Sequence, residues 1–124
     1  MFVDQDLSVY VSDLQNHRIM KWHEGARHGV VVAGGQGPGN SLRQLYVPLG
    51  IFVDPFGSLY VADQGNDRIM RWRKGATEGS IIAGRERGAQ SDQFHNPIDL
   101  SLDLHGNLYV VDERNHRVQR FSLR

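Results

Sequence analysis

Residues 59–72 read LYVADQGNDRIMRW, and two other stretches follow the same pattern: VYVSDLQNHRIMKW at 9–22 and LYVVDERNHRVQRF at 108–121. The three copies start 50 and then 49 residues apart. Self-similarity at such a period is typical of repeat architectures, in which each repeat is one supersecondary unit. The first two copies stay in step further along the chain, through VVAG at 31–34 and IIAG at 81–84. The sequence therefore contains two full repeats and part of a third.

Within one repeat, the residue types predict four short β-strands, near residues 50–54, 58–63, 68–73 and 79–83. Each of these segments is rich in β-branched or aromatic residues, which favour strands. Turn-forming residues separate the segments, including the Pro and Gly of DPFG at 54–57, because these residues suit tight reversals of the chain. Each repeat is thus predicted to be a four-stranded antiparallel meander.

The second strand of each repeat indicates how the sheets pack. A strand with one face in water alternates apolar and polar residues, whereas the LYVA sequence at 59–62 is apolar on both faces. Such a strand needs cover on both sides, and similar sheets stacked around an axis supply it. The lack of helical periodicity argues against a helical solenoid, and a β-sandwich does not need one motif repeated in step. The pattern favours a β-propeller, in which each sheet is one blade.

At these residues the sequence resembles the NHL repeat family, whose repeats carry a Gly or Asn turn, a Leu-Tyr-Val-Ala-Asp strand and an Asn-His-Arg turn. The best single copy spans residues 57–72, and residues 106–121 supply other forms of the motif. Asp67 departs from the pattern, because the other two copies have His17 and His116 at this position. The resemblance implies an all-β fold, a partial β-propeller of NHL type.

The chain is predicted to be one propeller segment, residues 1–124, with blade 1 at about 1–47, blade 2 at about 48–96 and partial blade 3 at about 97–124. We expect two complete four-stranded antiparallel blades and a three-stranded third blade. Because the resemblance implies rings of usually six blades, such a segment leaves blade faces and sheet edges open. Two explanations stay open: the segment is part of a longer chain, or a homodimer completes a six-bladed ring.

Charge and cysteine content narrow the classes of function. Lysine plus arginine and aspartate plus glutamate both number 14, so no global field attracts nucleic acid or an anionic membrane. The absence of cysteine excludes disulfides and thiolate metal sites. The first ten residues do not resemble a secretory signal, and no stretch has the roughly 20 apolar residues of a membrane span. These features favour a cytoplasmic protein that has no membrane partner, although the localisation stays open.

An aspartate, an asparagine and an arginine recur in every copy at one spacing: Asp13, Asn16 and Arg18, then Asp63, Asn66 and Arg68, then Asp112, Asn115 and Arg117. An aspartate that ends one strand and an arginine that opens the next satisfy each other and nearby backbone donors across the turn. A catalytic site occurs once in a chain, whereas this set occurs in every repeat. We therefore predict a structural network inside each blade.

Neither a metal centre nor a catalytic residue is predicted. Propellers of similar shape, such as the peptide-amidating lyases, hold a metal with histidines from several blades. Here the six histidines lie in turns and loops without ligand-type spacing, and Asp67 interrupts the one repeated series. No serine or lysine stands out as an activated nucleophile, and the glycine-rich segment 34–39 lacks the lysine of a phosphate-binding loop. No cofactor is expected.

Aromatic residues recur at two positions of the repeat, namely Tyr10, Tyr60 and Tyr109, and Trp22, Trp72 and Phe121. One interpretation is a set of platforms on which the bases of single-stranded nucleic acid stack. The fixed spacing favours the other interpretation, in which these rings fill the space between adjacent blades.

The binding surface is expected where the repeats differ, because a scaffold stays constant while a recognition surface varies. The connecting segments 36–44 and 85–93 and the turns between second and third strands differ in composition and are expected on one rim. The candidate binding residues on this loop face are Gln15, His17, Gln64, Asp67, Arg85, Arg87, Arg114 and His116.

These observations favour a non-catalytic binding module that recognises a protein or peptide partner. RNA binding is the first alternative, since some tripartite-motif members of the family that the sequence resembles bind single-stranded RNA on a basic face. A local group of basic residues suits this alternative: Arg68, Arg71, Arg73, Lys74, Arg85 and Arg87. A fragment of a propeller lyase or lactonase-like enzyme is the second alternative, because a fold alone does not determine function.

Overall fold

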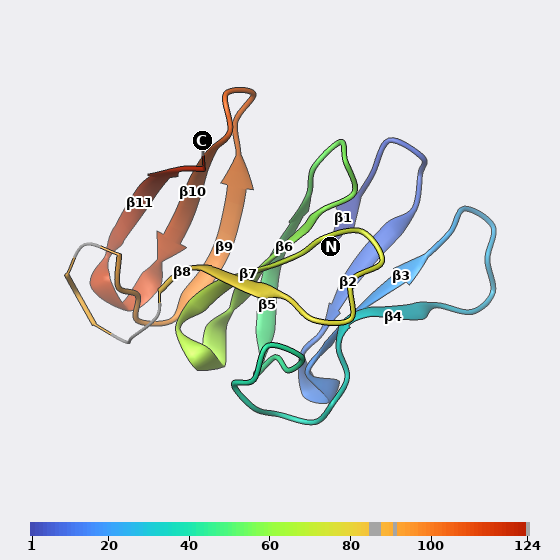
Figure 1. Ribbon diagram of the computed structural model, residues 1–124, viewed down its shortest axis with the longest axis horizontal. Helices are drawn as coiled ribbons and strands as arrows, with labels where there is room; N and C mark the ends of the chain where they lie inside the picture. Colours follow the sequence, from blue (N-terminus) through green and yellow to red (C-terminus); the bar gives the residue numbers. More distant parts are fainter. Residues whose placement is uncertain (85–87, 91, 124) are drawn as a thin grey trace.

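The computed structural model describes residues 1–84, 88–90 and 92–123. These residues form eleven strands in three antiparallel sheets, with one short 3₁₀ turn in each sheet. The predicted all-β fold is confirmed: two sheets have four strands and the third has three (Figure 1). In the described part of the chain, no helix is long and apolar enough to span a membrane.

The strands follow one another in space in their order along the chain, so each blade is an antiparallel meander. Blade 1 contains β1 (Phe2–Val3), β2 (Val9–Asp13), β3 (Arg18–Trp22) and β4 (Val30–Gly34). Blade 2 contains β5 (Pro48–Val53), β6 (Leu59–Asp63), β7 (Arg68–Trp72) and β8 (Ser80–Ala83). Blade 3 contains β9 (Pro97–Leu102), β10 (Asn107–Asp112) and β11 (Arg117–Ser122). The 3₁₀ turns are η1 (Leu14–Asn16), η2 (Gln64–Asn66) and η3 (Glu113–Asn115).

Alternation along the strands gives blade 2 two apolar faces. In blade 2, Leu59 pairs with Trp72 across β6 and β7, and both side chains pack toward blade 1. The intervening Tyr60 and Ala62 point the opposite way and pack toward blade 3, because successive side chains of a strand alternate between its faces. We call the side toward the preceding blade the leading face, and the side toward the following blade the trailing face.

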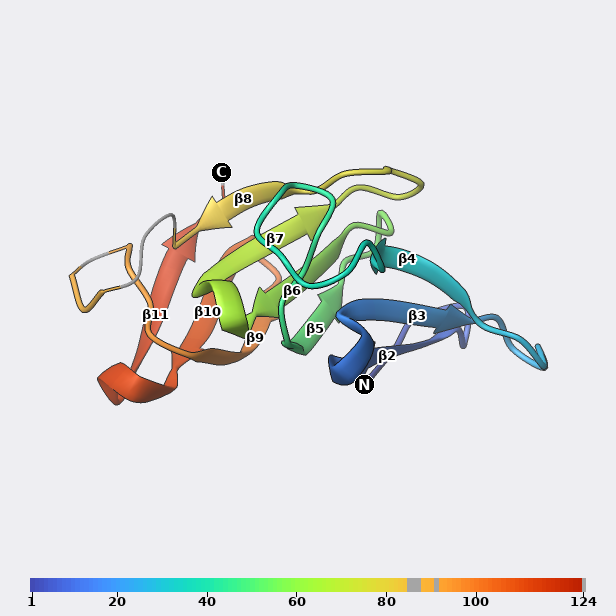
Figure 2. The ribbon, with the colours of Figure 1, turned by 90° about the horizontal axis from the view of Figure 1, so that it is seen from below.

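The hydrophobic core lies between the blades rather than within one sheet. The three sheets stand side by side like the blades of a fan, with blade 2 in the middle (Figures 1 and 2). One core cluster joins Tyr10 and Ile19 of blade 1 to Val61 and Trp72 of blade 2. A second cluster joins the trailing face of blade 2 to residues of blade 3 such as Leu108. Blade 2 is thus covered on both faces, which explains why its second strand is apolar throughout.

The connections between strands gather on two opposite rims. The 3₁₀ turns lie beside the segments that connect one blade to the next, since Gly65 N donates to Tyr46 O over 2.7 Å and Arg114 N to His95 O over 3.1 Å. We call this side the loop rim. The turns between first and second strands, such as residues 54–57, lie at the other end of the strands, on what we call the turn rim (Figure 1).

Candidate binding surfaces on the two rims

The Asp-Asn-Arg set forms the same hydrogen-bonded triad in every blade. In blade 2, Asp63 Oδ2 accepts from Asn66 Nδ2 and from Arg68 Nε, both over 2.8 Å. The same two bonds join the matching residues of the other two blades, Asp13, Asn16 and Arg18, and Asp112, Asn115 and Arg117. The spacing places the three side chains on one side of the 3₁₀ turn, so the triad needs only local structure to form.

In blades 2 and 3, the triad also binds the segment that arrives from the preceding blade. Arg68 donates from its two terminal nitrogens to three carbonyl groups, those of Asn40, Ser41 and Gln44, over 2.8–3.1 Å. Asp63 Oδ1 accepts from Tyr46 N of the same segment over 2.7 Å. Blade 3 repeats these bonds, with Arg117 on the carbonyls of Ala89, Gln90 and Gln93 and Asp112 on His95 N. The triad therefore connects consecutive blades.

The environment of the aspartate differs between blades 1 and 2. Burial raises the pKa of Asp63, although hydrogen bonds from Tyr46 N, Asn66 and Arg68 oppose this effect. The pKa of Asp13 is lowered, because Asn16 and then Arg18 hydrogen-bond its carboxylate while solvent still reaches it. The difference between the two pKa shifts reflects how much of each triad the neighbouring blade covers.

In blades 1 and 2, the residue that follows the 3₁₀ turn supplies an acceptor to the segment that leads to the next blade. His17 and Asp67 both adopt a left-handed conformation, with φ of 52° and 51°. His17 Nδ1 accepts from Val47 N over 3.0 Å, and Asp67 Oδ1 accepts from Asn96 N over 2.7 Å. A carboxylate oxygen and an unprotonated imidazole nitrogen can both accept a hydrogen bond from a backbone N–H. The departure of Asp67 from the repeat pattern therefore preserves the contact between blades.

The predicted binding residues of the loop rim divide into two groups. Gln64 donates to Asn96 Oδ1 and, with His17 and Asp67, takes part in contacts between blades. Gln15, Arg114 and His116 are exposed. Arg85 and Arg87 lie outside the described residues. Part of the predicted surface is thus engaged in holding the blades together.

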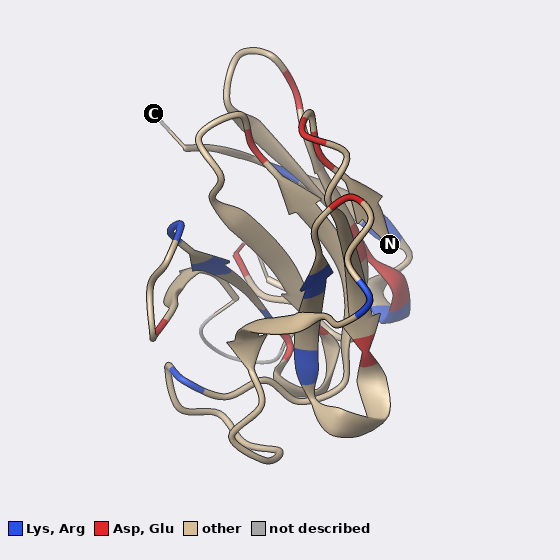
Figure 3. Ribbon diagram, turned by 90° about the vertical axis from the view of Figure 1, so that its right-hand side faces the viewer, with Lys and Arg blue, Asp and Glu red and all other residues tan. Residues whose placement is uncertain are grey.

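The predicted basic group does not form one patch among the described residues. Arg68 is buried and bound to the loop carbonyls, and Arg71 lies opposite Tyr60 across β6 and β7, where it acts to lower the pKa of the Tyr60 hydroxyl. Arg73 and Lys74 lie instead on the turn rim, beyond the end of β7. Figure 3 shows lysine and arginine positions separated by acidic and neutral segments. Arg85 and Arg87, which complete the predicted group, are not described.

On the turn rim, a second recurring pair escaped the sequence analysis. Asp4 Oδ1 accepts from Ser8 N over 2.9 Å, and Asp4 Oδ2 accepts from the Tyr10 hydroxyl over 3.0 Å. Burial, followed by the bond to Asp4, raises the pKa of Tyr10 to about 12. The same pairs occur in the other blades, Asp54 with Tyr60 and Asp103 with Tyr109. The sequence pattern that could have predicted these pairs is an aspartate six residues before each repeated tyrosine.

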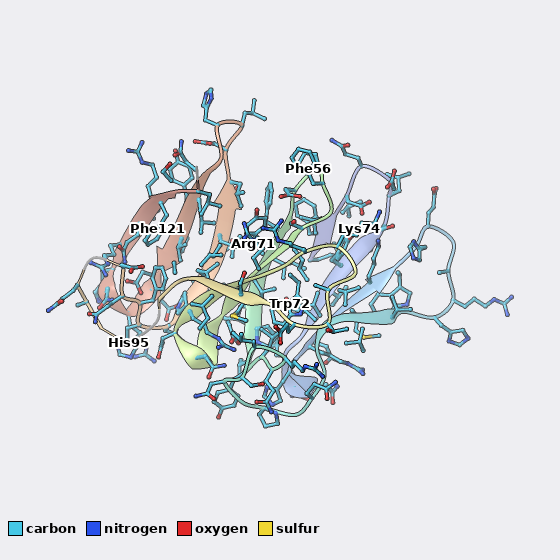
Figure 4. The ribbon with its side chains drawn as sticks, in the orientation of Figure 1. Phe56, Arg71, Trp72, Lys74, His95 and Phe121 are labelled. Carbon is cyan, nitrogen blue, oxygen red and sulfur yellow. The ribbon has the colours of Figure 1, made fainter. Side chains whose placement is uncertain are left out.

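Between blades 1 and 2, the turn rim is hollowed by a cavity of about 380 Å³, which we call the inter-blade groove. Ligand pockets have volumes of roughly 300–1,000 Å³ and combine apolar walls with a few polar groups. Aromatic side chains from both blades line the groove, including Phe2, Tyr10, Phe52, Phe56 and Trp72. Phe56 is 86% exposed and lies at the outer end of its turn (Figure 4), whereas Trp72 is only 2% exposed.

The charged side chains of the groove differ in how far the protein already uses them. Asp54 accepts hydrogen bonds from Phe56 N and from the Tyr60 hydroxyl. Lys21 lies over the ring of Tyr10, 5.3 Å from its centroid. Arg73 and Lys74 are exposed, and within the described part of the chain no hydrogen bond or ion pair engages their side chains. Their N–H donors are therefore available to a partner.

The corresponding position between blades 2 and 3 has different chemistry. Leu123 takes the place of Lys74 in the repeat, and it packs against the second core cluster. Leu123 N donates to Gly106 O over 3.2 Å. An apolar side chain thus packs where the first junction presents a lysine. The junction between blades 1 and 2 thus differs from the junction between blades 2 and 3. A surface that recognises a specific partner is expected to differ in this way between repeats.

Across residues 1–84, 88–90 and 92–123, histidine, aspartate and glutamate side chains do not come together in groups of three or more that could hold a metal ion. The carboxylates of the triads are satisfied by asparagine, arginine and backbone donors. These groups serve contacts within and between blades.

Comparison with known proteins identifies the repeat and the fold. The NHL repeat family matches residues 94–121, and no curated protein matches the sequence. An auxiliary nutrient binding protein from Bacteroides thetaiotaomicron superposes with a TM-score of 0.74 and 16% identity, over 91% of this chain and 34% of its own. A protein of unknown function from the same species has a TM-score of 0.78 and 18% identity, over 94% and 32% of the two chains.

A third solved structure is a catalytically inactive virginiamycin B lyase from Staphylococcus aureus with quinupristin. It superposes with a TM-score of 0.68 and 13% identity, over 98% of this chain and 40% of the lyase. This chain therefore spans about a third of the length of the first two structures, and the likeness at such low identity concerns the fold alone. The predicted resemblance is confirmed where it is tested: residues 94–121 match the NHL repeat, within a segment of consecutive β-propeller blades.

Proposed function

We propose that this chain is a non-catalytic binding module that recognises a protein or peptide segment on the turn rim. The observation that carries the proposal is the inter-blade groove, whose volume of about 380 Å³ lies in the range of ligand pockets. Its walls combine an exposed aromatic ring with cationic groups that the described chain leaves unpaired. Aromatic and arginine side chains are the residue types that most often dominate binding energy in interfaces.

The geometry also suggests what a partner would offer. An apolar side chain can pack against Phe56, which lines the groove and is largely exposed. A carboxylate beside this apolar residue can accept hydrogen bonds from Arg73 or Lys74, and such charge-assisted bonds are stronger than neutral ones. The preferred partner is therefore a peptide segment with an apolar residue next to an acidic one.

The non-catalytic part of the proposal rests on how the recurring polar groups are used. The aspartates, asparagines and arginines of the triads hold the connecting segments, and the Asp-Tyr pairs hold the turns. Catalysis needs a reactive group held against a base and free to meet a substrate. The recurring groups instead satisfy one another and the backbone, which supports a scaffold role.

Selection from a random peptide library displayed on phage tests this function. We expect enriched peptides to pair an apolar with an acidic residue. Synthetic versions should bind Phe56→Ala and Lys74→Ala at least about tenfold more weakly than the unchanged chain, the loss expected for central interface residues. The matched control is Arg114→Ala, an exposed change on the loop rim that should leave affinity unchanged.

Three outcomes would contradict the proposal. One is a failure to enrich any peptide. Another is loss of binding in Arg114→Ala with full binding in Phe56→Ala, which would move recognition to the loop rim. The last is a gel shift with single-stranded RNA whose affinity falls steeply with salt, because such a slope reports the release of counterions from phosphates.

A further inference from the structure

The connection between blades 1 and 2 and the connection between blades 2 and 3 use acceptors of different chemistry. His17 Nδ1 accepts from Val47 N over 3.0 Å, and Asp67 Oδ1 accepts from Asn96 N over 2.7 Å. An imidazole nitrogen accepts only while it carries no proton, whereas a carboxylate accepts throughout the neutral pH range. Histidine side chains change charge between about pH 5 and 8. The first connection is therefore open to disruption by mild acid in a way that the second is not.

Backbone hydrogen bonds hold the turn at His17 independently of its ring. His17 N donates to Leu14 O over 3.3 Å, and His17 O accepts from Gly35 N over 3.0 Å. The imidazole ring lies beside the ring of Tyr46, with 5.4 Å between the two centroids. Because the backbone bonds do not involve the imidazole, its protonation removes the bond from Val47 and leaves the turn in place.

The donor of the first connection is held in a strained conformation. Val47 has a φ of 52°, in the left-handed region. Such values are strongly disfavoured for β-branched residues, whereas asparagine adopts them more readily. Asn96, with a φ of 67°, occupies the matching position of the second connection. Strained residues persist only where the surrounding structure holds them, so Val47 depends on its bond to His17 more than Asn96 depends on the matching bond.

The charged groups on the elements around His17 are accounted for. Two ion pairs lie there, one in each of blades 1 and 2: Asp13 with Arg18, and Asp63 with Arg68. Arg43, the charged residue of the connecting segment, is exposed. The bordering segments 34–35 and 64–66 have no ionisable side chain. Since burial raises the pKa of Asp63, the experiment must separate the titration of this carboxyl from that of His17.

We propose that His17 makes the connection between blades 1 and 2 an acid-sensitive switch, in which protonation of its ring releases Val47 while Asp67 retains Asn96. Two observations carry the inference: a titrating acceptor stands where the next blade has a carboxylate, and the donor that it holds is strained. Acidification then frees the connecting segment at Val47. The preceding residue, Tyr46, stays bound to blade 2 through its backbone N–H and carbonyl.

Amide hydrogen exchange of the full chain, followed by NMR, tests the switch at both donors. Protection factors remove the intrinsic pH dependence of exchange, so they report the hydrogen bonds themselves. Between about pH 8 and about pH 5, the protection factor of the Val47 amide should fall by roughly fivefold to tenfold, the equilibrium weight of one net hydrogen bond. The protection factor of the Asn96 amide should stay the same.

Three variants assign the effect to the ring of His17. His17→Asp copies the acceptor of blade 2 and should keep Val47 protected at the lower pH. His17→Ala removes the acceptor and should leave Val47 equally unprotected at both pH values. His116→Asp is the matched control, because His116 has the same left-handed position after η3, with a φ of 54°, and among the described residues no N–H donates to its ring. This control should behave as the unchanged chain.

Two results would overturn the proposal. One is a Val47 protection factor that is equal at the two pH values in the unchanged chain. The other is a loss of Val47 protection that persists in His17→Asp, which would assign the response to Asp63. Both results can be read from one amide in a folded chain, so they do not depend on which partner the inter-blade groove binds.

Discussion

Blade 1 and blade 2 carry nearly the same residues on their leading faces, but only blade 2 has a described neighbour on that side. The Asp63–Arg68 pair is almost completely buried, with side chains 0% and 4% exposed. The Asp13–Arg18 pair forms over 2.9 Å with 28% and 35% of its side chains exposed. Local spacing alone therefore creates the pair, and the adjacent blade determines its surroundings. The same motif is a surface ion pair in one blade and a buried connector in the other.

The largest expected difference concerns the triad aspartates. Asp63→Asn should lower the free energy of unfolding by about 3–5 kcal/mol, because it leaves the buried Arg68 without its counter-charge. Asp13→Asn should cost at most about 1 kcal/mol, since an exposed pair is screened by solvent. Urea unfolding followed by circular dichroism measures both values, with the slope of the transition checking that each variant unfolds as the unchanged chain does.

Equal losses in these two variants would contradict the comparison, because they would show that the buried triad draws no more stability from its neighbour than the exposed one. Asp112→Asn is the matched control in the third blade. Asp112 is also fully buried, and Arg117 donates to three carbonyls. Its loss should therefore resemble that of Asp63→Asn.

Replacement of the two tryptophans should also destabilise blade 2 more than blade 1, but the difference in lost stability should be smaller than for the aspartates. Trp72 is 2% exposed between two blades, and Trp72→Ala should cost about 3–5 kcal/mol, as for large residues removed from a core. Trp22 is only partly buried on the open face, so Trp22→Ala should cost about half of this or less, in proportion to the apolar area lost from water. Thermal unfolding of both variants provides the measurement. A greater loss for Trp22 would show that its face is covered in solution.

The fold and the triads can be predicted from the sequence because both depend on residues that recur at a fixed spacing in every repeat. An internal period needs no knowledge of distant contacts, and the Asp63, Asn66 and Arg68 spacing fits one turn between two paired strands. The partners of Arg68 in the preceding segment could not be read in the same way. These partners are backbone carbonyl groups, which every residue has, so the sequence does not mark which of them accept a hydrogen bond. They also lie 24 to 28 residues earlier in the chain.

The candidate site was harder to predict for a related reason. Variation between repeats predicted binding residues on the loop rim. Two of these residues, His17 and Asp67, form hydrogen bonds that connect adjacent blades. The inter-blade groove is formed by turns of two different blades, with Phe2 and Tyr10 on one side and Phe56 and Trp72 on the other. Which turns face each other depends on how adjacent sheets stack, and a period of about 50 residues does not encode that.

The smallest expected effect compares the turn-rim aspartates of blades 2 and 3. The side-chain amide and then the backbone N–H of Asn107 hydrogen-bond Asp103 and hold the pKa of its carboxyl well below the ordinary range. In blade 2, Ser58 occupies the matching position and offers Asp54 its backbone N–H over 2.9 Å. The extra amide donor of Asn107 therefore distinguishes the two turns.

A carboxyl whose pKa is lower in the folded state stabilises the fold above its unfolded pKa, near about 3.9, and loses that contribution as the pH falls toward the folded pKa. Asn107→Ser should raise the pKa of Asp103, and the stability of the variant should then decline less between about pH 4 and pH 2. Titration of the Asp103 carboxyl by NMR and thermal unfolding over this range measure the two effects. Ser58→Asn is the reciprocal change and should make the acid-induced decline steeper. An unchanged Asp103 titration in Asn107→Ser would show that the backbone donors of the turn, rather than the Asn107 amide, determine its pKa.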